Sequence, residues 1–180
     1  MKFSVKELGL IALFSISLFV ANSQNGGYSK GDNLLNIGIG LNSNYDGGLP
    51  LGASFETGLF DDISVGAGVD YLSNKYNFGS GNTYKFTSLY FAARASYHFN
   101  NLLKISSDKV DIYAGLALGY RSFKWKNKSF NDVLGDSYGS GVFLGGYLGG
   151  KYYFSDNIGG FAELGATGSS NARLGIAFKF

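Results

Sequence analysis

The stretch NARLGIAFKF, residues 171–180, decides the fold that the sequence predicts. In an extended strand, successive side chains point to opposite sides. One side of this strand carries only apolar side chains, among them Leu174, Ile176, Phe178 and Phe180. The other side carries Arg173 and Lys179. An apolar strand with an unpaired edge promotes aggregation, so we expect this strand to be paired on both edges and to face an apolar solvent.

The composition of the 180-residue chain favours a single domain with an unusual balance of side chains. Aromatic residues make up 17% of the chain and charged residues only 16%, whereas about 25% of an average globular domain is charged. The formal net charge of +2 is too small to indicate a nucleic-acid partner. The absence of cysteine excludes disulfides and thiolate metal sites.

The N-terminal residues have the pattern of an export signal. Two lysines precede an apolar run over 8–20, which is shorter than the roughly 20 residues that a transmembrane helix needs. Ala21 and Ser23 are small residues in the positions that a cleavage site requires. The sequence therefore predicts a signal peptide over 1–23, an exported protein, and a flexible lead-in over 24–32.

From residue 33 onward the dominant pattern has a period of two, which is typical of strands. Tight acidic turns and longer polar stretches separate the alternating segments. The predicted strands are 33–42, 50–60, 63–72, 88–99, 109–121, 141–154, 158–166 and 171–180.

Charge is divided between the two faces of these strands. The apolar face carries no charged residue in any of them, and the opposite face carries the charges and many glycines. This is the reverse of a soluble barrel and matches the pattern of a transmembrane barrel. Closure leaves no backbone group unpaired in lipid. We therefore predict an all-β fold over 33–180, an eight-stranded antiparallel up-and-down transmembrane β-barrel. A soluble lipocalin-like carrier is the alternative and requires the opposite orientation of every strand.

Two segments resemble the small eight-stranded outer-membrane barrels of the OmpX and OmpA transmembrane-domain type. They are YYFSDNIGGFAELG (152–165), with its aromatic strand end and acidic turn, and ARLGIAFKF (172–180). The resemblance implies a monomer in the outer membrane of Gram-negative bacteria, in contact with its lipids and with both termini in the periplasm. It also implies a C-terminal signal read by the barrel-assembly machinery, formed here by Leu174, Ile176, Phe178 and Phe180.

The inward face predicts a network of charges inside the barrel. An eight-stranded barrel is only just wide enough for its own side chains, and charges in such an interior must be paired. We expect ion pairs that plug the lumen, and a narrow porin-like channel for ions or small solutes is the alternative. The predicted network is Glu56, Asp70, Arg94, Asp111, Arg121, Lys151, Glu163 and Arg173.

Catalysis is not expected. Ser96 and His98 share the inward face with Glu163, but a lipid hydrolase needs its nucleophile and base beside the acyl chains, which lie outside the barrel. One histidine and scattered carboxylates do not make a metal site. We expect no cofactor and no metal, and a role in envelope integrity or surface interaction.

The stretch RSFKWKNKSF, residues 121–130, interleaves cations with aromatic rings. On the outer rim of a barrel, such residues would meet the phosphates and upper acyl chains of lipopolysaccharide. A solvated loop with interface anchors is the alternative interpretation. The residues predicted to face lipopolysaccharide are Lys124, Trp125, Lys126 and Lys128.

Overall fold

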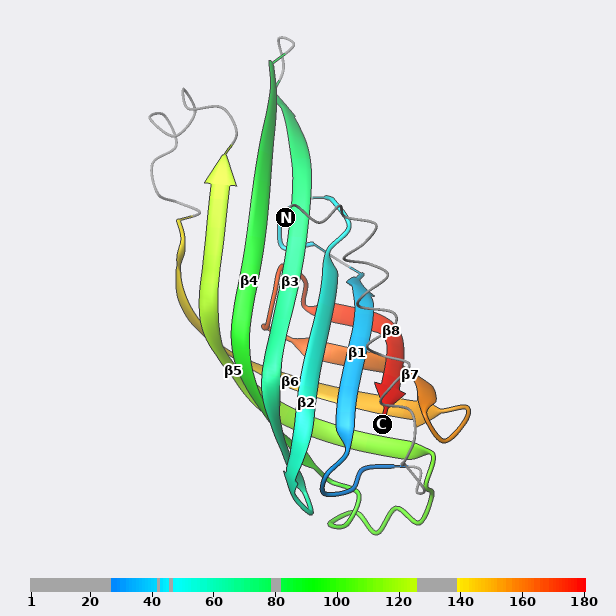
Figure 1. The fold of residues 1–180 in the computed structure, drawn as a ribbon. Coiled ribbons are helices and arrows are strands. Elements are labelled where there is room, and N and C mark those ends of the chain that lie inside the picture. Colours follow the sequence, from blue (N-terminus) through cyan, green and yellow to red (C-terminus); the bar gives the residue numbers. More distant parts are fainter. Residues whose placement is uncertain (1–26, 42, 46, 79–81, 126–138) are drawn as a thin grey trace, which may run out of the picture.

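The computed structural model describes residues 27–41, 43–45, 47–78, 82–125 and 139–180, without the side chains of 76–78 and 82–84. The predicted signal peptide lies outside these ranges. The described chain forms one closed antiparallel barrel (Figure 1). Its strands are β1 Asn33–Gly40, β2 Leu51–Phe60, β3 Ile63–Phe78, β4 Asn82–His98, β5 Val110–Trp125, β6 Gly141–Tyr153, β7 Ile158–Gly165 and β8 Ala172–Lys179. No helix in the described ranges is long and apolar enough to cross a membrane.

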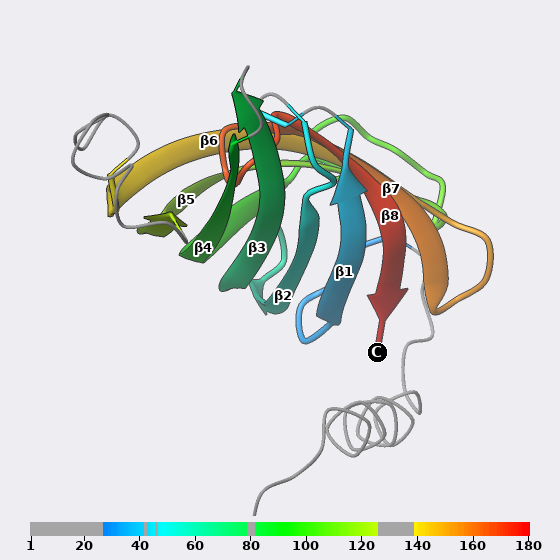
Figure 2. The same ribbon diagram turned by 90° about the horizontal axis from the view of Figure 1, so that it is seen from above.

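The barrel closes through its first and last strands, as the alternation in 171–180 predicts. β1 pairs with β8, and Ile37 lies opposite Ile176. At the end of this seam, Asn33 and Phe180 exchange two backbone hydrogen bonds of 2.7 and 3.0 Å. Figure 2 shows β1 and β8 side by side. The final strand therefore has no free edge.

The predicted division of charge between the two faces is confirmed. The outer wall is apolar, with exposed fractions of 62% for Leu116, 54% for Leu148 and 45% for Ile176. Inside the barrel, Glu56 and Arg94 are each 4% exposed. In a soluble barrel the side chains would face the opposite way, so the lipocalin-like alternative is wrong.

Three strands are longer than predicted. β3 extends to Phe78, β4 begins at Asn82, and β5 extends to Trp125, whereas the alternation predicts ends at 72, 88 and 121. Most of 73–87, which the sequence suggests is a loop, is therefore a β-hairpin that projects beyond the other strands (Figure 1). Alternation of apolar side chains stops where the outward residues of these strands become polar. The backbone hydrogen bonds between the strands continue beyond that point.

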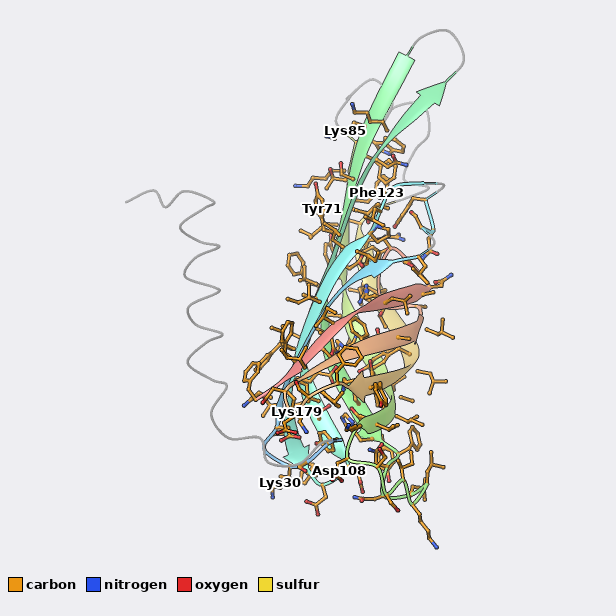
Figure 3. All side chains as sticks on the ribbon, turned by 90° about the vertical axis from the view of Figure 1, so that its right-hand side faces the viewer. Lys30, Tyr71, Lys85, Asp108, Phe123 and Lys179 are labelled. Carbon is orange, nitrogen blue, oxygen red and sulfur yellow. The ribbon has the colours of Figure 1, made fainter. Side chains whose placement is uncertain are left out.

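The two ends of the barrel differ. One end, here the turn end, holds the 61–62 and 154–157 turns, residues 27–32 and Phe180. The other, here the loop end, holds the tips of β3, β4 and β5 and the β7–β8 connection. Figure 3 shows Lys30 and Asp108 at the turn end and Lys85 at the loop end.

The connection 99–109 at the turn end is an exposed turn. Leu102 and Leu103 are 65% and 55% exposed, so they form a surface patch and do not cap the lumen. The turn is fixed by Asn100, whose amide donates to the Val110 carbonyl and accepts from the Ile112 N–H.

Candidate functional site: the filled lumen

Arg94 is the centre of the lumen network. Its Nη1 and Nη2 donate to the two carboxylate oxygens of Glu163 at 3.2 and 2.6 Å, a two-pronged contact from β4 to β7 across the barrel. Its Nε donates to Glu56 Oε1 on β2 at 3.0 Å. Its guanidinium also lies 3.9 Å from the ring centroid of Tyr147. Charge-assisted contacts of this kind are stronger than neutral ones, so one arginine links three strands.

The strand register explains how Arg94 reaches Glu56. Gly66 on β3 lies between them, opposite Glu56 on one side and Arg94 on the other. A Cβ on Gly66 would lie 1.8 Å from the Phe55 carbonyl oxygen. The position accepts only glycine, and the absence of a side chain lets the two charges meet over it.

A second ion pair is completed by the connection between β7 and β8. Arg173 Nη2 donates to Asp70 Oδ2 at 2.6 Å, and the Ser169 N–H donates to Asp70 Oδ1 at 2.8 Å. The Ser169 hydroxyl also donates to Asp70. At Gly168, a Cβ would lie 2.8 Å from the Asp70 carboxyl carbon. Residues 167–170 are buried, so this connection turns into the lumen.

A third group lies toward the turn end. Lys151 Nζ donates to Asp111 Oδ2 at 2.7 Å, and His98 Nδ1 lies 2.7 Å from Asp111 Oδ1. His98 Nε2 lies 2.9 Å from the Ser64 hydroxyl, which donates to Glu56 at 2.8 Å. This chain of contacts joins the third group to the Arg94 centre.

Ser64, His98 and Asp111 have the contact pattern of a hydrolase triad. The Glu56 carboxylate can only accept, so the Ser64 hydroxyl donates its proton to Glu56 and not to His98 Nε2. His98 is therefore not oriented to remove the serine proton. All three side chains are at most 1% exposed, so this arrangement holds charges in place and does not suit nucleophilic attack.

Ser96, which the sequence places beside His98, has other partners. Its hydroxyl contacts Glu56 Oε2 and the Tyr147 hydroxyl. Among the residues that the structure describes, no group of three or more histidine or carboxylate side chains is arranged to hold a metal ion.

Large rings fill the space that the inward glycines leave. Tyr147 lies over Gly115 and Tyr113 over Gly149, each pair directly opposite in the β5–β6 register. Phe161 fills the space beside two glycines of β1 and β8. One lumen cavity, bordered by Asp70 and Arg94, measures about 10 Å³, which is room for one water at most. The glycines therefore make room for rings and leave no path through this part of the lumen.

The turn end is covered by the chain that precedes β1. Tyr28 stacks on His98, with 3.6 Å between ring centroids and 3° between planes. Its hydroxyl donates to the Phe60 carbonyl at 2.8 Å, and Lys179 Nζ donates to the Gly27 carbonyl at 3.0 Å. Burial, with nearby carboxylates, raises the pKa of Tyr28 well above its usual value. The sequence suggests a flexible lead-in over 24–32, but its described part packs into the mouth of the barrel.

The loop end is closed by aromatic packing. Tyr45, from the β1–β2 connection, shares a 2.7 Å hydrogen bond with the Tyr90 hydroxyl. Around these two lie inward-facing apolar side chains, of which Leu72 and Phe86 are fully buried. We call this group the aromatic cluster; its members are Tyr45, Leu72, Phe86, Tyr90, Phe123, Trp125 and Phe143.

Two predicted site residues lie elsewhere than expected. Arg121 is separate from the ion pairs, because Tyr90 lies between it and Asp70 in the register, and its guanidinium donates to the Gly139 carbonyl at the loop end. Trp125 faces inward and packs on Phe86 at 5.6 Å, away from surrounding lipid. Lys124 is on the exposed face, and the other two predicted lipid-facing lysines lie outside the described residues.

The remaining members of the predicted network are brought together, along with residues that sequence reasoning missed. The structure adds Ser64, Ser169 and Tyr28. Ser64 and Ser169 are small and uncharged, so alternation alone gives them no distinctive signal. Tyr28 lies outside any alternating segment. Its only distinguishing feature in the sequence is that it is an aromatic residue among glycines and polar residues, which does not indicate where it packs.

Comparisons with known proteins agree on the fold. No family model matches the chain, and no curated protein matches its sequence. Among solved structures, the outer membrane protein OprG of Pseudomonas aeruginosa is similar with a TM-score of 0.59 at 13% identity, over 86% of this chain and 98% of that one. The N-terminal β-barrel domain of OprF, also from Pseudomonas aeruginosa, gives 0.53 at 16% identity, over 85% and 100%.

A third structure is the attachment invasion locus protein Ail of Yersinia pestis. It gives a TM-score of 0.51 at 12% identity, over 84% of this chain and 99% of that one. At these identities the likeness concerns the fold. The chain has the fold of the small eight-stranded outer-membrane β-barrels, the OmpX and OmpA type to which the sequence has a resemblance.

Proposed function

We propose that this chain is an integral protein of the bacterial outer membrane whose lumen is closed, and that it serves envelope integrity or surface interaction without catalysis. The observation that carries the proposal is the combination of an apolar outer wall with a network of buried ion pairs inside. A wall of this kind needs lipid around it. A lumen crossed by side chains from opposite strands offers no route for a solute.

Export and assembly are part of the same proposal. Residues 1–23 would direct export, and the alternating apolar positions of β8 would be read by the barrel-assembly machinery. One of the similar structures, OprG, is named an outer membrane protein, which supports this location for the chain. The turn end would then face the periplasm and the loop end the cell exterior.

Conductance across a planar lipid bilayer tests the closed lumen against the narrow channel. Purified wild-type protein is expected to give no discrete current steps. A matched variant, Tyr113→Ala with Tyr147→Ala, removes the two rings that fill the space over Gly115 and Gly149 and is expected to conduct. Flotation with vesicles verifies that both proteins are inserted. Regular steps from the wild type would contradict the closed lumen and favour the porin-like channel.

A further inference from the structure

Residues 27–32, here the docked segment, bridge the strands on both sides of β1 at the turn end. The Gly27 carbonyl accepts a 3.0 Å hydrogen bond from Lys179 Nζ on β8, and Figure 3 shows Lys179 at this end. The Tyr28 hydroxyl donates to the Phe60 carbonyl at the end of β2 at 2.8 Å. Because β1 lies between β8 and β2 in the sheet, these contacts join its two neighbours to each other.

Gly58 on β2 leaves the space that the docked segment occupies. A Cβ at this position would lie 2.8 Å from the Ser29 carbonyl oxygen, 2.9 Å from the Tyr28 hydroxyl oxygen and 3.0 Å from the Gly31 nitrogen. The Gly58 N–H donates to the Asp32 carbonyl at 2.8 Å, and the Gly58 carbonyl accepts from the Gly31 N–H at 2.9 Å. A side chain at Gly58 would therefore collide with the docked segment and not with the wall of the barrel.

The seam between β1 and β8 is the pairing that closes the barrel. It joins two strands of eight residues each, whereas β3 and β4 have 16 and 17 residues. It also joins the first strand to the last, so it closes a longer loop than any other pair of neighbouring strands and has the largest entropic cost. We expect such a pairing to form last and to reopen first.

The docked segment makes all of its contacts only after this seam has closed. Tyr28 stacks on His98 of β4, and the adjacent Gly27 is held by Lys179 of β8. β4 and β8 are not neighbours in the sheet, and they lie on opposite sides of the closed ring. Two adjacent residues can reach both strands only when closure has brought the strands around the same mouth.

We propose that the docked segment is a latch that engages after the barrel has closed and keeps the β1–β8 seam from reopening. Contacts that are absent from the transition state for folding slow unfolding and leave the folding rate unchanged. A latch that forms after closure makes contacts of this kind, so it adds kinetic stability. The inference goes beyond the proposed function, because it requires a closed barrel and does not depend on what the barrel does in the membrane.

Gly58→Val tests the latch from the barrel side. Valine is more favourable than glycine in a strand, so this variant should not unfold faster if the docked segment has no role. Because its side chain would exclude the segment, we expect unfolding in urea with detergent micelles to become about tenfold faster at an unchanged folding rate. The control, Gly150→Val, makes the same change on β6, where an added Cβ would lie 3.9 Å from the nearest non-neighbouring atom. It should not unfold faster than the wild type.

Amide hydrogen exchange locates the effect of Gly58→Val. The Asn33 N–H donates to the Phe180 carbonyl across the seam at 2.7 Å, and the Tyr153 N–H donates to the Lys109 carbonyl at the same end of the barrel at 2.8 Å. Exchange should become faster at Asn33 and stay unchanged at Tyr153. Equal acceleration at both amides would mean a general loss of stability and would overturn the latch.

Lys179→Met tests the same latch from β8, and it carries the test alone if Gly58→Val does not fold. Methionine keeps an apolar stem of similar length but cannot donate to the Gly27 carbonyl, so unfolding should be several-fold faster. In the double variant the two effects should not add, because either change alone releases the segment.

Three results would overturn the latch. The first is an unfolding rate in Gly58→Val that is no higher than that of the wild type, or that rises equally in Gly150→Val. The second is an additive effect in the double variant, which would mean that the two sites act separately. The third is slower folding at an unchanged unfolding rate, which would mean that the segment docks before the seam closes.

Discussion

The middle of the lumen and its loop end are filled by opposite chemistry. In the middle, Glu56, Arg94 and Glu163 are at most 5% exposed, and Arg94 contacts both carboxylates directly. At the loop end, the aromatic cluster packs rings around a single tyrosine–tyrosine hydrogen bond. A buried charge is costly unless it is paired, whereas a ring that is removed from a cluster leaves only a cavity. The two regions should therefore fail differently.

The largest effect is expected at the centre of the network. Arg94→Met leaves two buried carboxylates without their arginine, and the loss of one partner of such a pair costs about 3–5 kcal/mol. Equilibrium unfolding in urea with detergent micelles measures the loss. The control is Arg121→Met, an inward arginine that hydrogen-bonds the Gly139 carbonyl and the Tyr45 and Tyr90 hydroxyls and pairs with no carboxylate of the described residues. Its expected cost is about 1 kcal/mol. Similar costs for the two variants would show that the ion pairs do not dominate.

A smaller and more local effect is expected at the loop end. Phe86→Ala should cost about 3 kcal/mol, at the low end for a buried phenylalanine, because the cluster borders solvent. Trp125 packs on Phe86, so its fluorescence emission should shift to longer wavelength. The outward Phe91→Leu on the same strand should leave the emission unchanged. A shift of equal size in Arg94→Met would mean that the two regions are not separable.

The cover at the turn end should contribute less again. Tyr28→Ala removes the stack on His98, which for an aromatic pair is worth about 1 kcal/mol. Hydrogen exchange of the Gly31 amide measures the docking of residues 27–32. This N–H donates to the Gly58 carbonyl only while these residues are docked. We expect faster exchange at Gly31 and unchanged exchange in β4. Unchanged exchange at Gly31 would show that the stack does not hold the segment.

The smallest effect is a pH dependence of the same segment. Burial raises the pKa of Asp32, although the Ser29 N–H, which donates to Asp32 at 2.8 Å, opposes the shift. A carboxyl whose pKa is higher in the docked state binds its proton more tightly there. Docking should therefore weaken as the pH rises from below about 3.9 through the raised pKa. In Asp32→Asn, protection of the Gly31 amide should no longer change across this window, and a dependence that persists would exclude Asp32 as its source.

Alternation along the strands made much of this site predictable. A period of two is a local property, so a charge on the face opposite to Leu116 or Ile176 is placed in the lumen before any partner is known. Asp111 lies directly opposite Lys151 on the neighbouring strand, and Glu163 lies directly opposite Arg173. Once adjacent strands are in register, these two pairs of opposite charges are therefore side by side. The strand ends of β3 and β5 did not follow, because hydrogen bonding continues past the apolar pattern.

The sequence by itself determined the barrel, its inverted polarity and the set of inward charges, because strand geometry converts the order of residues directly into a face. Only the tertiary structure decided which charges meet across the lumen, that Tyr28 covers His98, and that Ser169 reaches Asp70. Those contacts join elements that are not adjacent in the sheet, and the diameter and stagger of the closed barrel set their distances.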